Sequence, residues 1–164
     1  MSRGGMEGEP TQPVDASSLL LQQLRALKRS EEDDLAETAA ARKEWIESVE
    51  GLLSALRAWM LPIVREGLAR LDAAVVHVTQ DDVGAYDAPA LKITMPGGRV
   101  VWVRPVGTLR VGARGIVDVV CGSSRALFVL NRRGVWKVRG AGPVAPLTLL
   151  DRSTFSRMLG ELIL

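Results

Sequence analysis

A regular repeat of apolar residues runs through the first half of the chain. From Ala16 to Asp72 the residues Leu, Ala, Glu and Arg dominate and Pro62 is the single proline, a composition typical of α-helix. The repeat, with spacings of 4, 3, 4, 3 and 4, is called the apolar seam here and consists of Trp45, Val49, Leu52, Leu56, Trp59 and Ile63. A stripe of this width must be covered by the first helical stretch, by the rest of the chain or by a second copy.

The helical half leaves its own subdivision open. Ser17 or Ser18 can cap a first helix, which carries Leu20, Leu24 and Leu27 on one side. Ser30 followed by Asp33 resembles a capping signal, so the chain either restarts there as a hairpin or continues as one long helix. Proline removes a helical hydrogen-bond donor, so Pro62 predicts a kink or restart, with a short final segment over 63–71.

After Asp72 the period of the apolar residues changes from about 3.6 to 2, and β-branched residues take over. Turn chemistry rich in Gly, Pro, Ser and Arg separates the candidate strands. Short connections predict an antiparallel meander of six to seven strands. Pro105 is expected at an edge, a bulge or a strand end. The candidate strands are 74–79, 90–95, 99–104, 108–111, 115–121, 126–130 and 135–139.

A short amphipathic helix closes the chain after the glycine- and proline-containing loop 140–146. Asp151 can cap it, and its apolar positions are Phe155, Leu159, Leu162 and Ile163. The fold class is therefore α+β: long N-terminal helices (a hairpin or coiled-coil arm), an antiparallel meander and a C-terminal helix. We expect a disordered tail over 1–15, a helical oligomerisation region over 16–72 and a basic β domain over 73–164.

Charge is unevenly distributed along the 164 residues, although the formal net charge is only +2. Residues 1–71 hold 9 basic and 12 acidic side chains, whereas residues 92–139 hold ten basic side chains and one acid, Asp118. Strand alternation gathers several of the cations on one sheet face with a single tryptophan. The predicted basic binding face consists of Lys92, Trp102, Arg104, Arg110, Lys137 and Arg139.

Two partners fit a basic face of this kind. Cations interleaved with an aromatic ring are used to bind single-stranded nucleic acid, but such surfaces commonly present two or three rings, whereas this face has one. The alternative, which we favour, is either a solvated face whose arginine side chains lie over apolar neighbours or a face covered by an acidic protein surface from elsewhere in the assembly. The acidic run Glu31–Asp34 with Glu37 is one candidate for that acidic surface.

Candidate reactive groups are few. Cys121 is the only cysteine and His77 the only histidine, so one chain builds neither a disulfide nor a zinc site with several Cys ligands. Parity makes Cys121 a small buried hydrophobe and His77 a surface residue. Asp81, Asp82 and Asp87 lack the spacing of a Ca²⁺ loop, and Gly112–Gly115 lacks the pattern and following helix of a phosphate loop. We therefore expect no enzyme activity, metal or cofactor.

These patterns favour a cytoplasmic, non-enzymatic interaction protein without a membrane span or secretion signal. We expect it to form a homo-oligomer, a dimer being favoured, with the apolar seam as the interface. The basic β domain would then be presented to an acidic protein partner, and nucleic-acid binding by the same face is the alternative.

Overall fold

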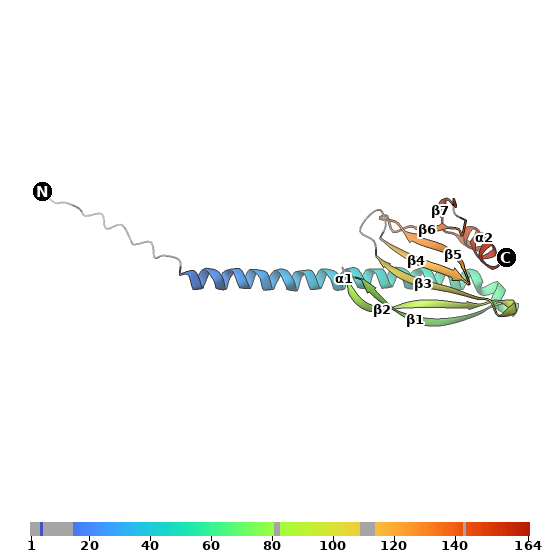
Figure 1. Cartoon of the computed structure of the whole chain (residues 1–164), viewed down its shortest axis with the longest axis horizontal. Coiled ribbons are helices and arrows are strands. Elements are labelled where there is room, and N and C mark those ends of the chain that lie inside the picture. The colour runs from blue at the N-terminus through green and yellow to red at the C-terminus, as the bar shows by residue number, and fades with distance from the viewer. Residues whose placement is uncertain (1–3, 5–14, 81–82, 109–113, 143) are drawn as a thin grey trace. The chain divides into compact units, whose positions relative to one another are not determined.

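The computed structural model describes residue 4 and residues 15–80, 83–108, 114–142 and 144–164. The chain divides into two compact units, residues 1–37 and 38–164. One helix, α1 (Ala16–Arg65), is followed by seven strands and a last helix, α2 (Arg152–Ile163) (Figure 1). This order confirms the α+β fold class.

The helical half is one continuous helix, so the hairpin alternative is not adopted and Ser30 starts no new helix. Asp15, rather than Ser17 or Ser18, precedes the first turn, where its Oδ1 accepts a hydrogen bond from the Ser17 hydroxyl at 3.0 Å. The last turn contains Pro62, which is exposed. Exposure lets water satisfy the carbonyl that lost its donor, so the predicted restart over 63–71 is wrong.

Gly67 ends α1 with a left-handed turn. Its φ is +71°, its amide donates to the Val64 carbonyl at 3.0 Å, and the next amide, of Leu68, donates to the Ile63 carbonyl at 3.1 Å. These two bonds form a Schellman motif, in which a left-handed glycine satisfies the last helical carbonyls. The chain therefore leaves the helix abruptly and enters the first strand at Arg70.

The strands form one antiparallel sheet in sequential order, as the short turns predicted. A one-turn 3₁₀ helix, η1 (Pro96–Gly98), joins the second and third strands. The strands are β1 (Arg70–Gln80), β2 (Gly84–Thr94), β3 (Val100–Thr108), β4 (Gly115–Cys121), β5 (Ser124–Leu130), β6 (Trp136–Arg139) and β7 (Leu147–Leu149).

Several strand predictions differ from the structure. β1 and β2 begin several residues earlier than expected, because their hairpin pairing extends from Arg70 opposite Thr94 to Gln80 opposite Gly84. β3 continues through Pro105 to Thr108, and the register shift between Pro105 and Gly107 is the expected bulge. The predicted separate strand at 108–111 therefore begins where β3 ends, and 109–111 lie outside the described residues. β7 was not predicted.

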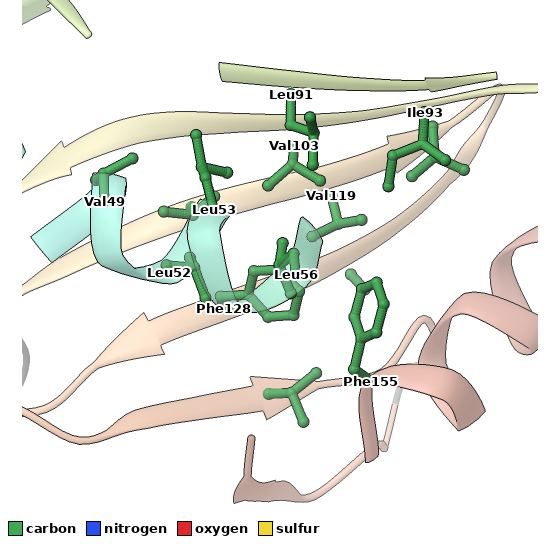
Figure 2. Close-up of a cluster of buried hydrophobic side chains, with 14 of the residues drawn as sticks. Val49, Leu52, Leu53, Leu56, Leu91, Ile93, Val103, Val119, Phe128 and Phe155 are labelled. Carbon is green, nitrogen blue, oxygen red and sulfur yellow. The ribbon is translucent and has the colours of Figure 1, made fainter. Parts of the chain in front are cut away.

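Both helices of the second unit pack on the same face of the sheet. Val49, Leu53 and Leu56 of α1 meet Val103, Val119 and Phe128 in the core (Figure 2). α2 joins them through Phe155, whose ring centroid lies 5.7 Å from that of Trp59 and 6.4 Å from that of Phe128. The predicted cap of α2 is confirmed: the Asp151 carboxylate accepts from the Thr154 amide at 2.9 Å.

Within the ranges described, no helix has an apolar run long enough to cross a membrane.

Candidate functional site

The sheet has an outer face that neither the part of α1 from residue 38 onward nor α2 covers. Along β3, Val101 and Val103 are fully buried toward the helices, whereas Trp102 is half-buried and Arg104 exposed on the other side. The same alternation holds along β4 and β5. The outer face, as used below, consists of Lys92, Val100, Trp102, Arg104, Ile116, Asp118, Val120, Arg125, Leu127, Val129, Lys137 and Arg139.

Strand register places these side chains in rows across the sheet. One row runs from Lys92 through Trp102 and Val120 to Arg125. The next runs from Arg104 through Asp118 and Leu127 to Arg139, and a third contains Ile116, Val129 and Lys137. Directly paired residues on one face are in contact. Each row therefore joins cations to apolar side chains, so the face combines positive charge with apolar surface.

Trp102 is the one aromatic ring among the outer-face residues. The Lys92 Nζ lies 5.7 Å from its ring centroid, and the Arg104 guanidinium carbon lies at 6.0 Å. Both distances are within the range of cation–π attraction. A groove of about 630 Å³ adjoins the ring, and it is lined by Arg99, Val100, Cys121, Ser124 and the last residues of α2, among others.

The cations outnumber the acids on the outer face. Asp118 is held by Arg125, with 2.8 Å between the Oδ2 and Nη2 atoms. Within the described part of the chain, Lys92, Arg104, Lys137 and Arg139 have no acidic side chain at ion-pair distance. Five of the six predicted basic-face residues thus share one surface, and the sixth, Arg110, lies outside the described residues.

Sequence reasoning missed the aliphatic half of this face. Ile116, Val120, Leu127 and Val129 are each half-buried between the cations. The available signal was the near-continuous apolar character of β4 and β5, which is typical of strands that contact something on both faces.

The apolar seam is covered by its own chain. Trp45, Val49, Leu52 and Leu56 are buried, and Trp59 and Ile63 pack half-buried against the same core. Trp45 also contacts Trp136 of β6, with ring centroids 6.0 Å apart. The rest of the chain is therefore the cover that the stripe required. A second copy would have to use other side chains, because these ones face the sheet.

The first part of α1, residues 16–37, presents its leucines to solvent. Every residue in this stretch is exposed. The exposed leucines include Leu24 at 52% and Leu35 at 70%, and the full set is Leu19, Leu20, Leu21, Leu24, Leu27 and Leu35. A contiguous apolar stripe on an uncovered helix is typical of an interaction surface.

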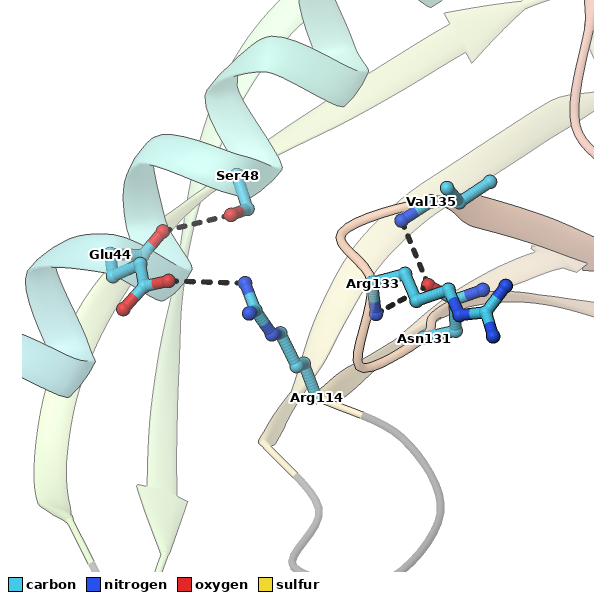
Figure 3. A network of polar contacts seen from close by, with 6 residues as sticks. All are labelled: Glu44, Ser48, Arg114, Asn131, Arg133 and Val135. Atoms are coloured by element: carbon cyan, nitrogen blue, oxygen red, sulfur yellow. Dashed lines mark hydrogen bonds and ion pairs between the residues drawn. The ribbon is translucent and has the colours of Figure 1, made fainter.

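Polar contacts join α1 to the strands. The Glu44 carboxylate accepts from Arg114 at 3.1 Å, and the Ser48 hydroxyl donates to the Glu44 carbonyl at 2.9 Å (Figure 3). In the turn before β6, the Asn131 side chain accepts from the amides of Arg133 and Val135 at 3.0 and 2.9 Å. Of these contacts, the Glu44–Arg114 pair joins α1 to the residue before β4, the Ser48 bond lies within α1, and the Asn131 bonds lie within the turn.

Arg42 lies one turn before Trp45, the first residue of the apolar seam, and its charged side chain contacts the β1–β2 hairpin. Its guanidinium donates to the Val83 carbonyl and lies 5.6 Å from the ring centroid of Tyr86. The Tyr86 hydroxyl in turn donates to Gln80 at 2.9 Å. Burial raises the pKa of Tyr86, while the Trp45 indole and the Arg42 charge partly offset that rise. The group anchors the β1–β2 hairpin to α1.

The candidate reactive groups lie apart. Cys121 is half-buried on β4, whereas His77 is an exposed residue of β1, its Nδ1 3.0 Å from the Asp87 Oδ1. β2 and β3 lie between those strands. Asp87 belongs to β2 rather than to a loop, and Asp81, Asp82 and 112–113 lie outside the described residues. Among the residues that the structure describes, no three His, Cys, Asp or Glu side chains could hold a metal ion.

Comparisons with protein-family models, with curated proteins and with solved structures found no match. The two uncovered surfaces, on the sheet and on residues 16–37, are therefore the features from which a function can be argued.

Proposed function

We propose that this protein is a non-enzymatic assembly module that self-associates through α1 and binds an acidic protein partner on the outer face of its sheet. The observation that carries the proposal is the outer face itself, where Lys92, Arg104, Lys137 and Arg139 surround half-buried aliphatic side chains and Trp102. Uncompensated cations attract and orient an acidic partner, and apolar contact then supplies binding free energy.

Aliphatic side chains favour a protein over a nucleic acid as the partner. Bases are bound by stacking on aromatic rings, and Ile116, Val120, Leu127 and Val129 offer none. A protein partner buries such side chains at roughly 25 cal/mol per Å² of apolar surface. The outer face can therefore pair its cations with the acidic side chains of an amphipathic segment and pack its aliphatic side chains against the apolar ones.

Nucleic-acid binding is the second candidate, and one observation favours it. Lys92 and Arg104 flank the Trp102 ring, which is how a stacking residue and phosphate-binding cations are arranged in single-strand sites. Such binding would weaken steeply with salt, because each neutralised phosphate releases counterions.

Self-association through α1 is supported by residues 16–37 rather than by the apolar seam. Leu20, Leu24 and Leu27 follow each other at spacings of 4 and 3 on one side of the helix, and all are exposed. Fully burying a leucine side chain contributes roughly 1.5–3 kcal/mol, so three can hold two copies together, with a dimer favoured. We also expect the module to act in the cytoplasm, since its single cysteine forms no disulfide within the chain.

Binding of two polyanions to the full chain tests the partner class. Poly-L-glutamate and a single-stranded oligothymidine are titrated onto the wild type and onto Arg104→Glu/Arg139→Glu, at low and at physiological salt. We expect poly-L-glutamate to bind and the double variant to weaken that binding at least tenfold. Arg57→Glu/Arg152→Glu changes the charge equally away from the face and is the control. Tight oligothymidine binding that Trp102→Ala abolishes would favour the second candidate instead.

A further inference from the structure

We infer that the acidic partner of the outer face is residues 20–35 of a second copy of this chain. The inference rests on the proposed function and identifies its two unpartnered surfaces as partners of each other. It depends on three observations: which acids share a helix side with the exposed leucines, the charge and apolar content of the outer face, and the lengths of the two surfaces.

The exposed leucines and two of the acids occupy the same side of the helix. At 100° per residue, positions separated by 3 and 4 residues lie above one another. The set with these spacings is called the leucine–acid face and consists of Leu20, Leu24, Leu27, Glu31, Asp34 and Leu35. At the same 100° per residue, Asp33 lies about 150° and Glu37 about 110° from the middle of this face. The apolar stripe therefore continues directly into carboxylates and ends on Leu35, which is 70% exposed.

This face is poorly suited to pairing with its own copy in a parallel, in-register coiled coil. Glu31 would then meet Glu31, and Asp34 would meet Asp34, at the centre of the contact. Like charges placed together at an interface are destabilising. The leucine–acid face needs a surface that is apolar in one part and positive in another.

The outer face has that composition. Its cations Arg104 and Arg139 end one row, with Leu127 and Asp118, which is paired with Arg125, between them. Lys92 and Trp102 lie in the next row. Leucine side chains can pack on Trp102, Ile116 and Val129 while Glu31 and Asp34 reach the cations. Carboxylate–guanidinium pairs are favoured among such contacts because they form charge-assisted hydrogen bonds.

The lengths of the two surfaces also match. From Lys92 on β2 to Lys137 on β6 the outer face crosses five strands, which at about 4.8 Å per spacing is about 19 Å. From Leu20 to Leu35 the leucine–acid face rises about 22 Å at 1.5 Å per residue. One helix can therefore cross the open sheet, as helices commonly cover sheets in α+β proteins.

Charge reversal on each surface of the full chain, measured by sedimentation equilibrium, tests the inference. Glu31→Lys/Asp34→Lys changes the leucine–acid face, and Arg104→Glu/Arg139→Glu changes the outer face. We expect each variant to weaken self-association at least tenfold. Asp33→Lys/Glu37→Lys makes the same charge change outside the leucine–acid face and is the control for the first variant. Arg57→Glu/Arg152→Glu makes the charge change of the second variant away from the outer face. Both controls should stay within threefold of the wild type.

Mixing the two defective variants is the decisive step. Every contact between unlike copies then pairs opposite charges, so the mixture should associate to within about threefold of the wild type, detected with one variant fluorescently labelled. A mixture that stays dissociated would overturn the inference. It would mean that the two surfaces do not pair between copies, for example because they pair within one chain, where mixing cannot restore the contact.

The inference and the proposed function can fail separately. If Arg104→Glu/Arg139→Glu loses poly-L-glutamate binding but self-associates like the wild type, the outer face has a different acidic partner and the inference is wrong. If that variant alters neither property, the proposed function is wrong as well.

Discussion

The two parts of α1 carry the same kind of leucine repeat but differ in what covers it. Leu24, in residues 16–37, is 52% exposed, whereas Leu56, in the second part, is fully buried. The sheet of the same chain covers the second part, whereas the leucines of the first part are exposed. Periodicity therefore shows that a helix face needs a cover, but it does not tell whether the cover lies in the same chain.

Of the substitutions proposed, truncating one leucine in each part of α1 should give the largest difference in the free energy of unfolding. Leu56→Ala removes a fully buried side chain from the core, so it should lower the free energy of unfolding by about 2–5 kcal/mol. Leu24→Ala should change it by less than about 0.5 kcal/mol in the dissociated chain, because the side chain is already exposed. Urea unfolding at low protein concentration measures both. Equal losses would mean that residues 16–37 are covered within one chain.

Adding a methyl group at Gly115 should cause the next largest loss of stability, because it would displace Trp45 of α1. Any Cβ there would overlap the ring of Trp45, which is buried against the sheet. Overpacking of this kind typically costs about 1–3 kcal/mol, so Gly115→Ala should lower the midpoint of urea unfolding accordingly. An unchanged midpoint would show that Trp45 packs elsewhere.

The N-cap of α2 also bears on the buried part of α1, because Phe155 of α2 packs on Trp59 of α1. Asp151→Ala should lower the Tm by a few degrees at neutral pH. The hydrogen bond that the Thr154 backbone amide donates to the Asp151 carboxylate holds the pKa of Asp151 below its ordinary value of 3.8. That stabilisation is therefore present above pH 4 and lost as the pH falls through the lowered pKa.

Substituting Asp151 by Asn separates the contribution of the capping hydrogen bond from that of the ionised carboxylate. Asp151→Asn keeps an oxygen that accepts the amide hydrogen bond, so it should retain part of the stability without the acid dependence. If the wild type and Asp151→Ala kept the same Tm difference at pH 2 and pH 7, the charged cap would be excluded as the cause.

Filling an exposed glycine on the covered part should have the smallest effect, with the opposite sign. Gly51 lies on the solvent side of α1, and a Cβ there meets nothing within 4 Å. Gly51→Ala should therefore stabilise the fold by roughly 0.5–1 kcal/mol through helix propensity alone. A loss of stability in thermal unfolding would mean that a partner or another element approaches this side.

Local chemistry predicted most of the fold. Alternation along β3 and β4 and the turns between strands gave the meander, and the Asp151 cap gave α2. The single helix was not predictable, because Ser30 and Asp33 resemble a cap in sequence and only the continuing helix shows that they are not one. β7 was missed since Pro146 precedes it and the strand is three residues long, too short for a periodic signal.

The candidate site was predicted in part, for a physical reason. Strand parity placed Lys92, Trp102, Arg104, Lys137 and Arg139 on one face. The same parity made the opposite face the core-like one, but it did not show which elements cover that face, because this depends on contacts between residues far apart in the chain. For the same reason, sequence reasoning assigned the apolar seam to a second copy, although the sheet of the same chain covers it.

The most direct test of the account is the concentration dependence of the molecular mass in sedimentation equilibrium, for the wild type and for Leu24→Asp/Leu27→Asp. Both leucines are exposed, so the variant should keep the circular dichroism spectrum and unfolding midpoint of the dissociated wild type. We expect the wild type to associate as its concentration rises and the variant to stay at the monomer mass of 17.7 kDa. A wild type that remains a monomer at every concentration, or a variant that associates equally well, would contradict the account.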